Sequence, residues 1–284
     1  MTKLLNGRDV VEVMNADTTK SVKELEQRGV KPTLAIVRVG ELKDEIAYER
    51  GAIKRCEDVG VATSKYLLSK DATQKQVLDT IIRLNDDASI HGILLLCPLP
   101  AHIDEDVVRN AINPDKDVDG ITDKSIASVY AGENVGFAPC TAQSCIELLE
   151  HYNYDFSGKN AVVVGRSLVV GKPVAMMMLD RNSTVTIAHS RSINLPEIVR
   201  QADLVIAAVG RARLVDANHL RPGQTVIDVG INVENNGQLV GDVDFSAAVN
   251  IVDAITPVPG GIGKVTTSVL CKHVVQAATK FANN

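Results

Sequence analysis

The sequence predicts an α/β protein with two domains, each built on a parallel β-sheet. The chain has 284 residues, and at roughly 150 residues per domain this length supports two hydrophobic cores. Short apolar runs alternate with helical segments, which is typical of parallel strands covered by helices on both faces. A bridge from Phe137 to Gly158 separates two such alternating sets. We therefore expect a first domain from 1–141 together with the last helix, 266–284, and a second domain from 142–265.

The first alternating set is predicted from three buried runs and the helical patterns between them. Thr73 or Asp71 is the expected N-terminal cap of the second helix. The expected strands are Leu34–Gly40, Tyr66–Leu68 and Gly92–Cys97, and the expected helices are Asp44–Val59, Thr73–Leu84 and Asp104–Ile112.

The second set starts after an amphipathic helix that is expected to end at Leu149. The last helix of this set follows the break Pro257–Gly261, where proline and glycine interrupt regular structure. The expected strands are Asn160–Gly165, Thr184–His189, Asp203–Gly210, Thr225–Gly230 and Ile251–Thr256, and the expected helices are Gly171–Leu179, Leu195–Gln201 and Thr266–Phe281.

Composition excludes several classes of function. Hydrophobic residues make up 45% and charged residues 23%, which rules out disorder as the main state. With 3% aromatic residues and a net charge of −5, neither a stacking platform nor a basic field for nucleic acid is expected. The five cysteines are scattered without zinc-binding spacing, so we expect no metal site and reduced thiols. No membrane helix and no signal peptide are expected, which predicts a cytoplasmic protein.

A glycine-rich turn after the strand 160–165 predicts dinucleotide binding. This strand runs into the segment Gly165-Arg166-Ser167-Leu168-Val169-Val170-Gly171-Lys172-Pro173, and a helix follows. Gly165 permits a tight turn, and the N–H groups at the start of the helix can face a pyrophosphate. The spacing is G-x-S-x-x-x-G rather than G-x-G-x-x-G, so Ser167 offers a hydroxyl where the usual motif has only backbone. A purely structural turn is the alternative.

The end of the next strand favours NADP over NAD. In NAD sites an Asp or Glu at this point binds the ribose 2′-hydroxyl, but here the strand ends in His189-Ser190-Arg191-Ser192, without an acid. Arg166 and Arg191 suit a 2′-phosphate because guanidinium matches phosphate geometry. The alternative is that Arg191 is a solvated surface residue.

These motifs together resemble those of the methylenetetrahydrofolate dehydrogenase/cyclohydrolase family, from end to end of the chain. The matching segments are Asn113–Gly120, Pro139–Thr141, Val164–Pro173 and Ile255–Gly263. The resemblance implies an N-terminal substrate domain and a C-terminal Rossmann-like NADP-binding domain, with a folate cleft between them. It implies an oxidoreductase of one-carbon metabolism, usually a homodimer, that oxidises 5,10-methylenetetrahydrofolate to the methenyl form with NADP. Most family members then act as a hydrolase and form 10-formyltetrahydrofolate.

The resemblance also assigns roles to individual residues. Tyr48 maps onto the tyrosine that stacks on the substrate, and Asp119 maps onto the carboxylate that holds the pterin ring; these two are the expected catalytic residues. A carboxylate can accept two hydrogen bonds from the amino-pyrimidinone edge, whereas the alternative for Asp119 is a loop cap. The expected cofactor contacts are Gly165, Arg166, Ser167, Gly171, Ser190, Arg191 and Ile231, and the expected lining of the folate site is Pro259, Gly260 and Gly261.

Two positions depart from the family's pattern. Bifunctional members have the motif Tyr-x-x-x-Lys, which places the lysine one helical turn after the tyrosine, and here that position is Ala52. Lys54 lies about 240° around the helix from Tyr48, at about 100° per residue, and cannot replace that lysine. Bifunctional members also have a glutamine where this chain has Leu96. In the family, the lysine and the glutamine form a hydrogen-bonded pair associated with hydrolysis.

The two changes predict a dehydrogenase with weak or absent cyclohydrolase activity. Hydrolysis needs water activation and proton transfer, whereas hydride transfer needs the nicotinamide close to the methylene carbon. The alternative is a bifunctional enzyme in which Arg55, an ordered water or Glu45, which replaces the family's usual serine, takes over. A remote alternative is a silent folate- or nucleotide-binding protein. Lys264 also differs from many members, and we expect it to face solvent.

Overall fold

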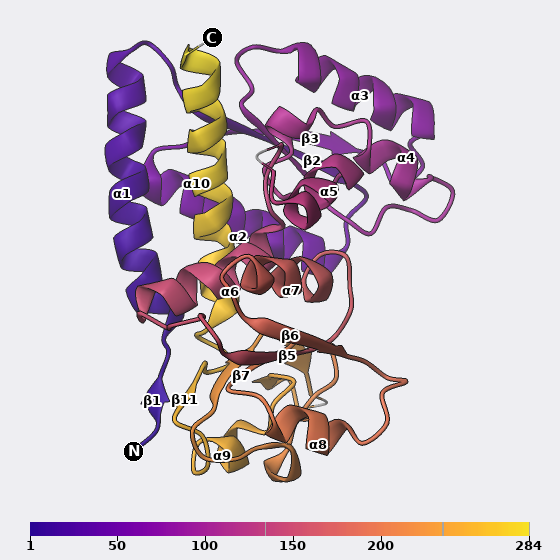
Figure 1. The fold of residues 1–284 in the computed structure, drawn as a ribbon. Coiled ribbons are helices and arrows are strands. Elements are labelled where there is room, and N and C mark those ends of the chain that lie inside the picture. Colours follow the sequence, from indigo (N-terminus) through magenta and orange to yellow (C-terminus); the bar gives the residue numbers. More distant parts are fainter. Residues whose placement is uncertain (134, 235, 284) are drawn as a thin grey trace. The chain divides into compact units, whose positions relative to one another are not determined.

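The computed structural model describes residues 1–133, 135–234 and 236–283, and the chain divides into two compact units. The three-strand unit comprises Val13–Cys140 and Thr267–Asn284, and the six-strand unit comprises Met1–Glu12 and Thr141–Thr266. Each unit combines helices with a parallel sheet (Figure 1). The two-domain α/β fold expected from the sequence is confirmed.

The three-strand unit has β2 (Thr33–Val39) at the centre of its sheet. This strand pairs in parallel with β3 (Ala62–Leu68) on one side and with β4 (Gly92–Leu95) on the other. All its residues from Leu34 onward are buried, because helices cover both faces of a parallel sheet. The helical elements of this part of the chain are α2 (Lys43–Val59), α3 (Gln74–Asp86), α4 (Glu105–Arg109), the 3-10 turn η1 (Pro114–Lys116) and α5 (Asp123–Ala131).

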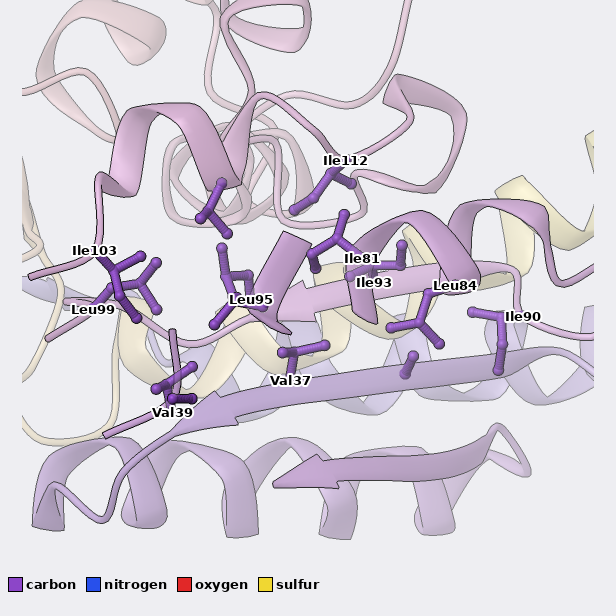
Figure 2. Packing of buried hydrophobic residues seen from close by; sticks show 14 residues of the cluster. Val37, Val39, Ile81, Leu84, Ile90, Ile93, Leu95, Leu99, Ile103 and Ile112 are labelled. Atoms are coloured by element: carbon purple, nitrogen blue, oxygen red, sulfur yellow. The ribbon is translucent and has the colours of Figure 1, made fainter. Parts of the chain in front are cut away.

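One face of this sheet carries an aliphatic core. Val37 of β2 and Leu95 of β4 belong to the same buried cluster as Ile81 and Leu84 of α3 (Figure 2). Every fully buried member of the cluster is aliphatic, in agreement with the low aromatic content of the chain. On helix α3, Thr73 accepts a hydrogen bond from the Gln76 amide while the Gln76 side chain accepts one from the Thr73 amide. This capping box decides between the two expected caps in favour of Thr73.

The six-strand unit contains a sheet with the order β1-β11-β8-β7-β5-β6, in which all neighbours are parallel. From β5 (Asn160–Val164) the chain passes to β6 (Thr184–Ala188) on one side and then returns to β7 (Leu204–Ala207) on the other side. This reversal creates a topological switch point at the carboxyl end of β5, the place where open α/β sheets bind ligands. The outer strands are β8 (Thr225–Asp228), β11 (Ala254–Ile255) and β1 (Lys3–Leu4).

Strand β1 joins the beginning of the chain to the six-strand unit. Lys3 pairs with Ala254 and Leu4 with Ile255, and the Leu5 amide donates to the Ile255 carbonyl at 2.9 Å. Residues 1–12 therefore belong with 141–266, whereas the sequence analysis placed them in the first domain. The physical reason is that the outer edge of β11 offers unpaired backbone groups, which these residues satisfy.

The remaining elements complete both units. The sequence analysis does not predict α1, α5, α9 or the short pair β9 and β10, and α10 begins four residues earlier than expected. These remaining elements are α1 (Gly7–Gln27), α6 (Cys140–His151), α7 (Gly171–Leu179), α8 (Leu195–Arg200), η2 (Ala217–His219), β9 (Asn232–Val233), β10 (Leu239–Val240), α9 (Phe245–Ala248) and α10 (Ile262–Asn283). Across the described ranges, no helix is long and apolar enough to cross a membrane.

Candidate functional site

Gly165 lies at the switch point of the six-strand sheet. It directly follows β5, and its amide donates to the Ala188 carbonyl at the end of β6 at 2.8 Å. Its φ of 135° belongs to the region that favours glycine. A Cβ atom at this position would collide with the carbonyl oxygen of Ala208, just after β7. Glycine is therefore required by both the backbone angle and the neighbouring strand end.

The turn that follows brings the start of helix α7 close to the end of β5. A Cβ on Gly171 would lie 2.6 Å from the Gly165 carbonyl carbon and 2.8 Å from the Arg166 amide nitrogen. The Ser167 hydroxyl accepts hydrogen bonds from the amides of Val170 at 3.2 Å and Gly171 at 3.3 Å. Two glycines and one serine thus shape a compact, exposed loop at the place where a dinucleotide-binding sheet holds its pyrophosphate.

The turn after β6 presents polar side chains to solvent. The His189 amide donates to the Ser192 hydroxyl at 2.9 Å, and the Arg191 amide donates to Nδ1 of His189 at 3.1 Å. Ser190 and Arg191 are exposed, as is Arg166 in the glycine-rich turn. Neither guanidinium has an ion-pair partner among the described residues, so both are available to an anionic ligand.

A second group of predicted residues surrounds a small cavity in the same unit. Ile231, Pro259, Gly260 and Gly261 all line a cavity of about 210 Å³. The sequence analysis assigned Ile231 to the cofactor and the other three to folate, and the structure places them around one space. The loop is anchored by the Gly7 amide, which donates to the Gly260 carbonyl at 2.9 Å. Lys264 also lines this cavity and its side chain is exposed.

In the three-strand unit, Asp119 is a half-buried residue on the loop after η1. Burial, together with the nearby charge of Asp117, raises the pKa of Asp119 to about 7, although a contact with the Cys140 thiol acts in the opposite direction. The Asp117 carboxylate is occupied by the amides of Ile121 at 3.0 Å and Thr122 at 2.8 Å. Asp117 therefore caps the loop, which leaves Asp119 as the carboxyl group suited to a ligand.

Tyr48 lies within electrostatic range of Asp119. Burial raises the pKa of the Tyr48 phenol well above its usual value, and the charge of Asp119 adds to the shift. The phenol is therefore neutral at physiological pH. Tyr48 and Asp119 come from α2 and from the loop after η1, so the fold gathers two of the predicted residues that are 71 positions apart in the sequence.

The two positions that depart from the family's pattern are closed to solvent. Ala52 is 0% exposed and Leu96 is 4% exposed. Lys54, in contrast, is 71% exposed and pairs with Asp58 at 2.7 Å, so its ammonium group lies at the surface beside its own helix. Arg55 donates from Nε to the Thr267 hydroxyl at 3.4 Å and lies on the side of α2 that meets α10.

Glu45 replaces the serine that is usual in the family, and the sequence does not show what surrounds it. It is 5% exposed, and neither carboxylate oxygen has a hydrogen-bond partner among the described residues. Burial raises its pKa, while the charge of Arg38 and the backbone of Leu42 oppose the shift. Its spacing of three residues before Tyr48 was the available signal, but sequence alone does not show burial without a partner.

Across the described ranges, no group of three or more His, Cys, Asp or Glu residues could hold a metal ion. The six-strand unit thus offers a glycine-rich turn, two exposed arginines and a glycine- and proline-lined cavity. The three-strand unit separately offers the half-buried Tyr48 and Asp119.

Two models of known protein families match this chain. The model for the tetrahydrofolate dehydrogenase/cyclohydrolase catalytic domain matches residues 5–119, and that for the NAD(P)-binding domain of the same enzymes matches residues 139–282. The chain belongs to the tetrahydrofolate dehydrogenase/cyclohydrolase family. The expectation from the sequence motifs is confirmed, and the chain carries the family's NAD(P)-binding domain.

Individual members of the tetrahydrofolate dehydrogenase/cyclohydrolase family match over nearly their full length. The bifunctional protein FolD of Clostridioides difficile is 46% identical over 282 residues, covering 99% of this chain and 98% of that protein. The crystal structure of FolD from Campylobacter jejuni has a TM-score of 0.97 at 36% identity, covering 99% of both chains. The enzyme from Trypanosoma brucei, solved with NADP and an inhibitor, has a TM-score of 0.92 at 33% identity, covering 98% of both chains.

Proposed function

We propose that the protein oxidises 5,10-methylenetetrahydrofolate to 5,10-methenyltetrahydrofolate with NADP as the hydride acceptor. The observation that carries this proposal is the Gly165–Gly171 turn at the switch point of the six-strand sheet, in a chain that matches the family along its length. Bound NADP supplies a nicotinamide ring that accepts the hydride. The protein's part is to bind and orient the two ligands.

The proposed folate contacts use the Tyr–Asp pair. The Asp119 carboxylate accepts hydrogen bonds from the amino-pyrimidinone edge of the pterin, a charge-assisted pairing that is stronger inside a buried site. The neutral ring of Tyr48 stacks on the substrate. Pro259, Gly260 and Gly261 are proposed to line the folate site, and Ile231 to contact the cofactor. The half-buried position of Asp119 supports this assignment, because Asp117 already caps the loop and Asp119 is left for recognition of a ligand.

The two unpaired arginines support NADP rather than NAD. We expect Arg191→Ala to raise KM for NADP by about tenfold or more, because a charge-assisted contact to the 2′-phosphate is lost. KM for NAD, which lacks that phosphate, is expected to stay within about twofold. Steady-state kinetics with both cofactors on the same variant provide the measurement. An equal loss with both cofactors would show that Arg191 does not read the phosphate.

Catalysed hydrolysis of the methenyl bridge is the second candidate activity. The relatives from Clostridioides difficile and Campylobacter jejuni are named as bifunctional proteins, and this favours hydrolysis here too. The buried Ala52 and Leu96 carry no group that can transfer a proton. We therefore propose a bifunctional enzyme in which hydrolysis is weak relative to dehydrogenation.

Restoring the family's polar pair is expected to strengthen hydrolysis. The double variant Ala52→Lys with Leu96→Gln should raise the rate of methenyl hydrolysis by about tenfold or more, since a positioned proton-transfer group typically contributes 10²–10⁴-fold. Both positions are buried, so circular dichroism and a melting curve must show that the variant folds. A folded double variant with no gain would contradict the proposed cause of the weakness.

A spectrophotometric assay separates the activities. Appearance of NADPH with methylenetetrahydrofolate reports dehydrogenation, and accelerated loss of methenyl absorbance reports hydrolysis. Ligand binding without either signal would indicate a silent binding protein and would overturn the proposed function. The homodimer is a further proposal that rests on the family resemblance, and light scattering of the purified protein tests it.

A further inference from the structure

Glu45 carries a buried carboxyl group that pairs with no cationic side chain of the described residues. It belongs to the first turn of α2 and is 5% exposed, and both its carboxylate oxygens lack a hydrogen-bond partner among the described residues. A buried charge is costly unless it is paired. A buried polar group without a partner needs a physical explanation, and binding of a positively charged ligand would provide it.

Arg38, whose charge acts on Glu45, is already paired with Glu49. Arg38 donates from Nε to the Glu49 carboxylate at 2.7 Å and from Nη1 to the Gly40 carbonyl. Lys65 lies 3.8 Å from the other carboxylate oxygen of Glu49. Two acidic residues one turn apart on α2 thus differ: Glu49 has two cationic partners, whereas the charge of Arg38 reaches Glu45 only through space.

Glu45 lies on the side of α2 that holds the proposed folate residue Tyr48. Residues three and four positions apart share a helix face, and Glu45, Glu49 and Ala52 are all buried on that face. Cys97, just after β4, lies close enough to both Glu45 and Asp119 to be affected by their charges. Burial raises the pKa of the Cys97 thiol to about 12, and the charges of both Asp119 and Glu45 contribute to this shift. The two carboxyl groups therefore lie within electrostatic range of the same thiol.

The proposed oxidation creates a positive charge at a defined place. A hydride leaves the bridge carbon with both electrons of the C–H bond, and the lone pair of an adjacent folate nitrogen forms a C=N bond. The methylene substrate is neutral at the bridge, whereas the methenyl product shares one positive charge between two nitrogens. A carboxylate beside the bridge stabilises the product and the transition state that resembles it more than the substrate.

We propose that the Glu45 carboxylate faces the one-carbon bridge of the bound folate and stabilises the methenyl cation that hydride transfer creates. This inference rests on the proposed dehydrogenase activity. Ala52 lies on the same buried face of α2 and carries no charge, so among the described residues Glu45 has no charged neighbour one or two turns further along that face other than the acidic Glu49. The same stabilisation lowers the reactivity of the bridge toward water, which is the direction that the proposed weak hydrolysis requires.

The variant Glu45→Gln tests the proposal because it keeps the shape and removes the charge. We expect its affinity for 5,10-methenyltetrahydrofolate to fall by about tenfold to hundredfold, as loss of a unit charge at close range implies. Its affinity for 5-formyltetrahydrofolate, which has the same pterin and tail but a neutral one-carbon group, should change less than about twofold. In the dehydrogenase assay kcat should fall by a similar factor while KM for the neutral methylene substrate stays nearly constant.

Asp44→Asn is the matched control. Asp44 lies in the same helical turn but is exposed, so its charge is screened by solvent, and neither affinity should change. Equal losses for the cationic and the neutral ligand in Glu45→Gln, or no loss at all, would overturn the proposal. Wild-type protein without dehydrogenase activity would instead overturn the proposed function.

Thermal unfolding without ligand separates this role from a structural one. Because burial raises the pKa of Glu45, its ionised form opposes folding, and the free protein should lose no stability when Gln replaces it. If Glu45→Gln unfolds at a lower temperature than the wild type, Glu45 contributes to the stability of the free protein. In that case the variant Glu45→Asp, which keeps the charge, decides the question. It must bind methenyltetrahydrofolate more tightly than Glu45→Gln, or the proposal is overturned.

Discussion

Replacement of Gly165 by alanine is expected to destabilise the protein by about 3–4 kcal/mol and to abolish NADP binding. The new Cβ would meet the Ala208 carbonyl, and the φ of 135° is unfavourable for any residue with a side chain. Relief of the collision requires the ends of β5 and β7 to separate, which would distort the turn proposed to hold the pyrophosphate. A melting curve and a titration with NADP measure the two effects.

Gly158 offers a matched control for this substitution. It also has a positive φ, of 70°, but a Cβ there would meet nothing within 4 Å. Gly158→Ala should therefore lose only the backbone contribution, about 1–2 kcal/mol, and keep NADP affinity. If both variants were equally stable and bound NADP equally well, the close approach to Ala208 would not be the reason for glycine at position 165.

Asp119→Asn is expected to weaken folate binding by about a hundredfold or more, because two charge-assisted hydrogen bonds lose the charge and one loses its acceptor. The same variant should change the pH dependence. With a pKa of about 7 in the free protein, Asp119 is increasingly protonated below neutrality, so the kcat/KM of the wild type for folate should fall as pH falls from about 8 to 6. In Asp119→Asn this dependence should disappear.

The raised pKa also sets the sign of the stability change with pH. The carboxyl group holds its proton more tightly when folded than when unfolded, so its contribution to the free energy of unfolding is complete below about pH 4 and is lost as pH rises through about 7. Asp117→Asn should behave differently: it removes one of the two acceptor oxygens that bind the amides of Ile121 and Thr122, so stability should fall. Loss of the Asp117 charge lowers the pKa of Asp119, so the kcat/KM profile should move to lower pH without disappearing. An unchanged kcat/KM profile in Asp119→Asn would remove Asp119 from folate recognition.

The strands were predictable where burial is continuous along the sequence. β2, β5, β7 and β8 consist of nearly unbroken aliphatic runs, and a parallel sheet covered on both faces needs such runs. Helix α1 escaped prediction because its buried stripe, Val10, Met14 and Val22 with Leu25, is interrupted by the polar Thr18. The pair β9 and β10 has only two residues per strand, too few to produce a pattern.

The sequence predicted which residues belong to the candidate site, but it did not predict what surrounds each of them. The motif identified Gly165, yet the carbonyl that demands glycine belongs to Ala208, which follows a different strand. Likewise, the sequence marks Glu45 as a departure from the family's serine, but its burial without a partner depends on Arg38 being engaged by Glu49. Such facts arise from tertiary contacts, which no local pattern encodes.

The pairing of β1 with β11 has a consequence for the order in which the protein is made. Thr2 donates its hydroxyl proton to the Val252 carbonyl at 2.7 Å, across 250 residues of chain. At about 5–20 residues per second of translation, β1 leaves the ribosome on the order of 10 to 50 seconds before its partner exists. In the proposed cofactor-binding sheet, the backbone groups of β1 can therefore pair only after the much later β11 has been made.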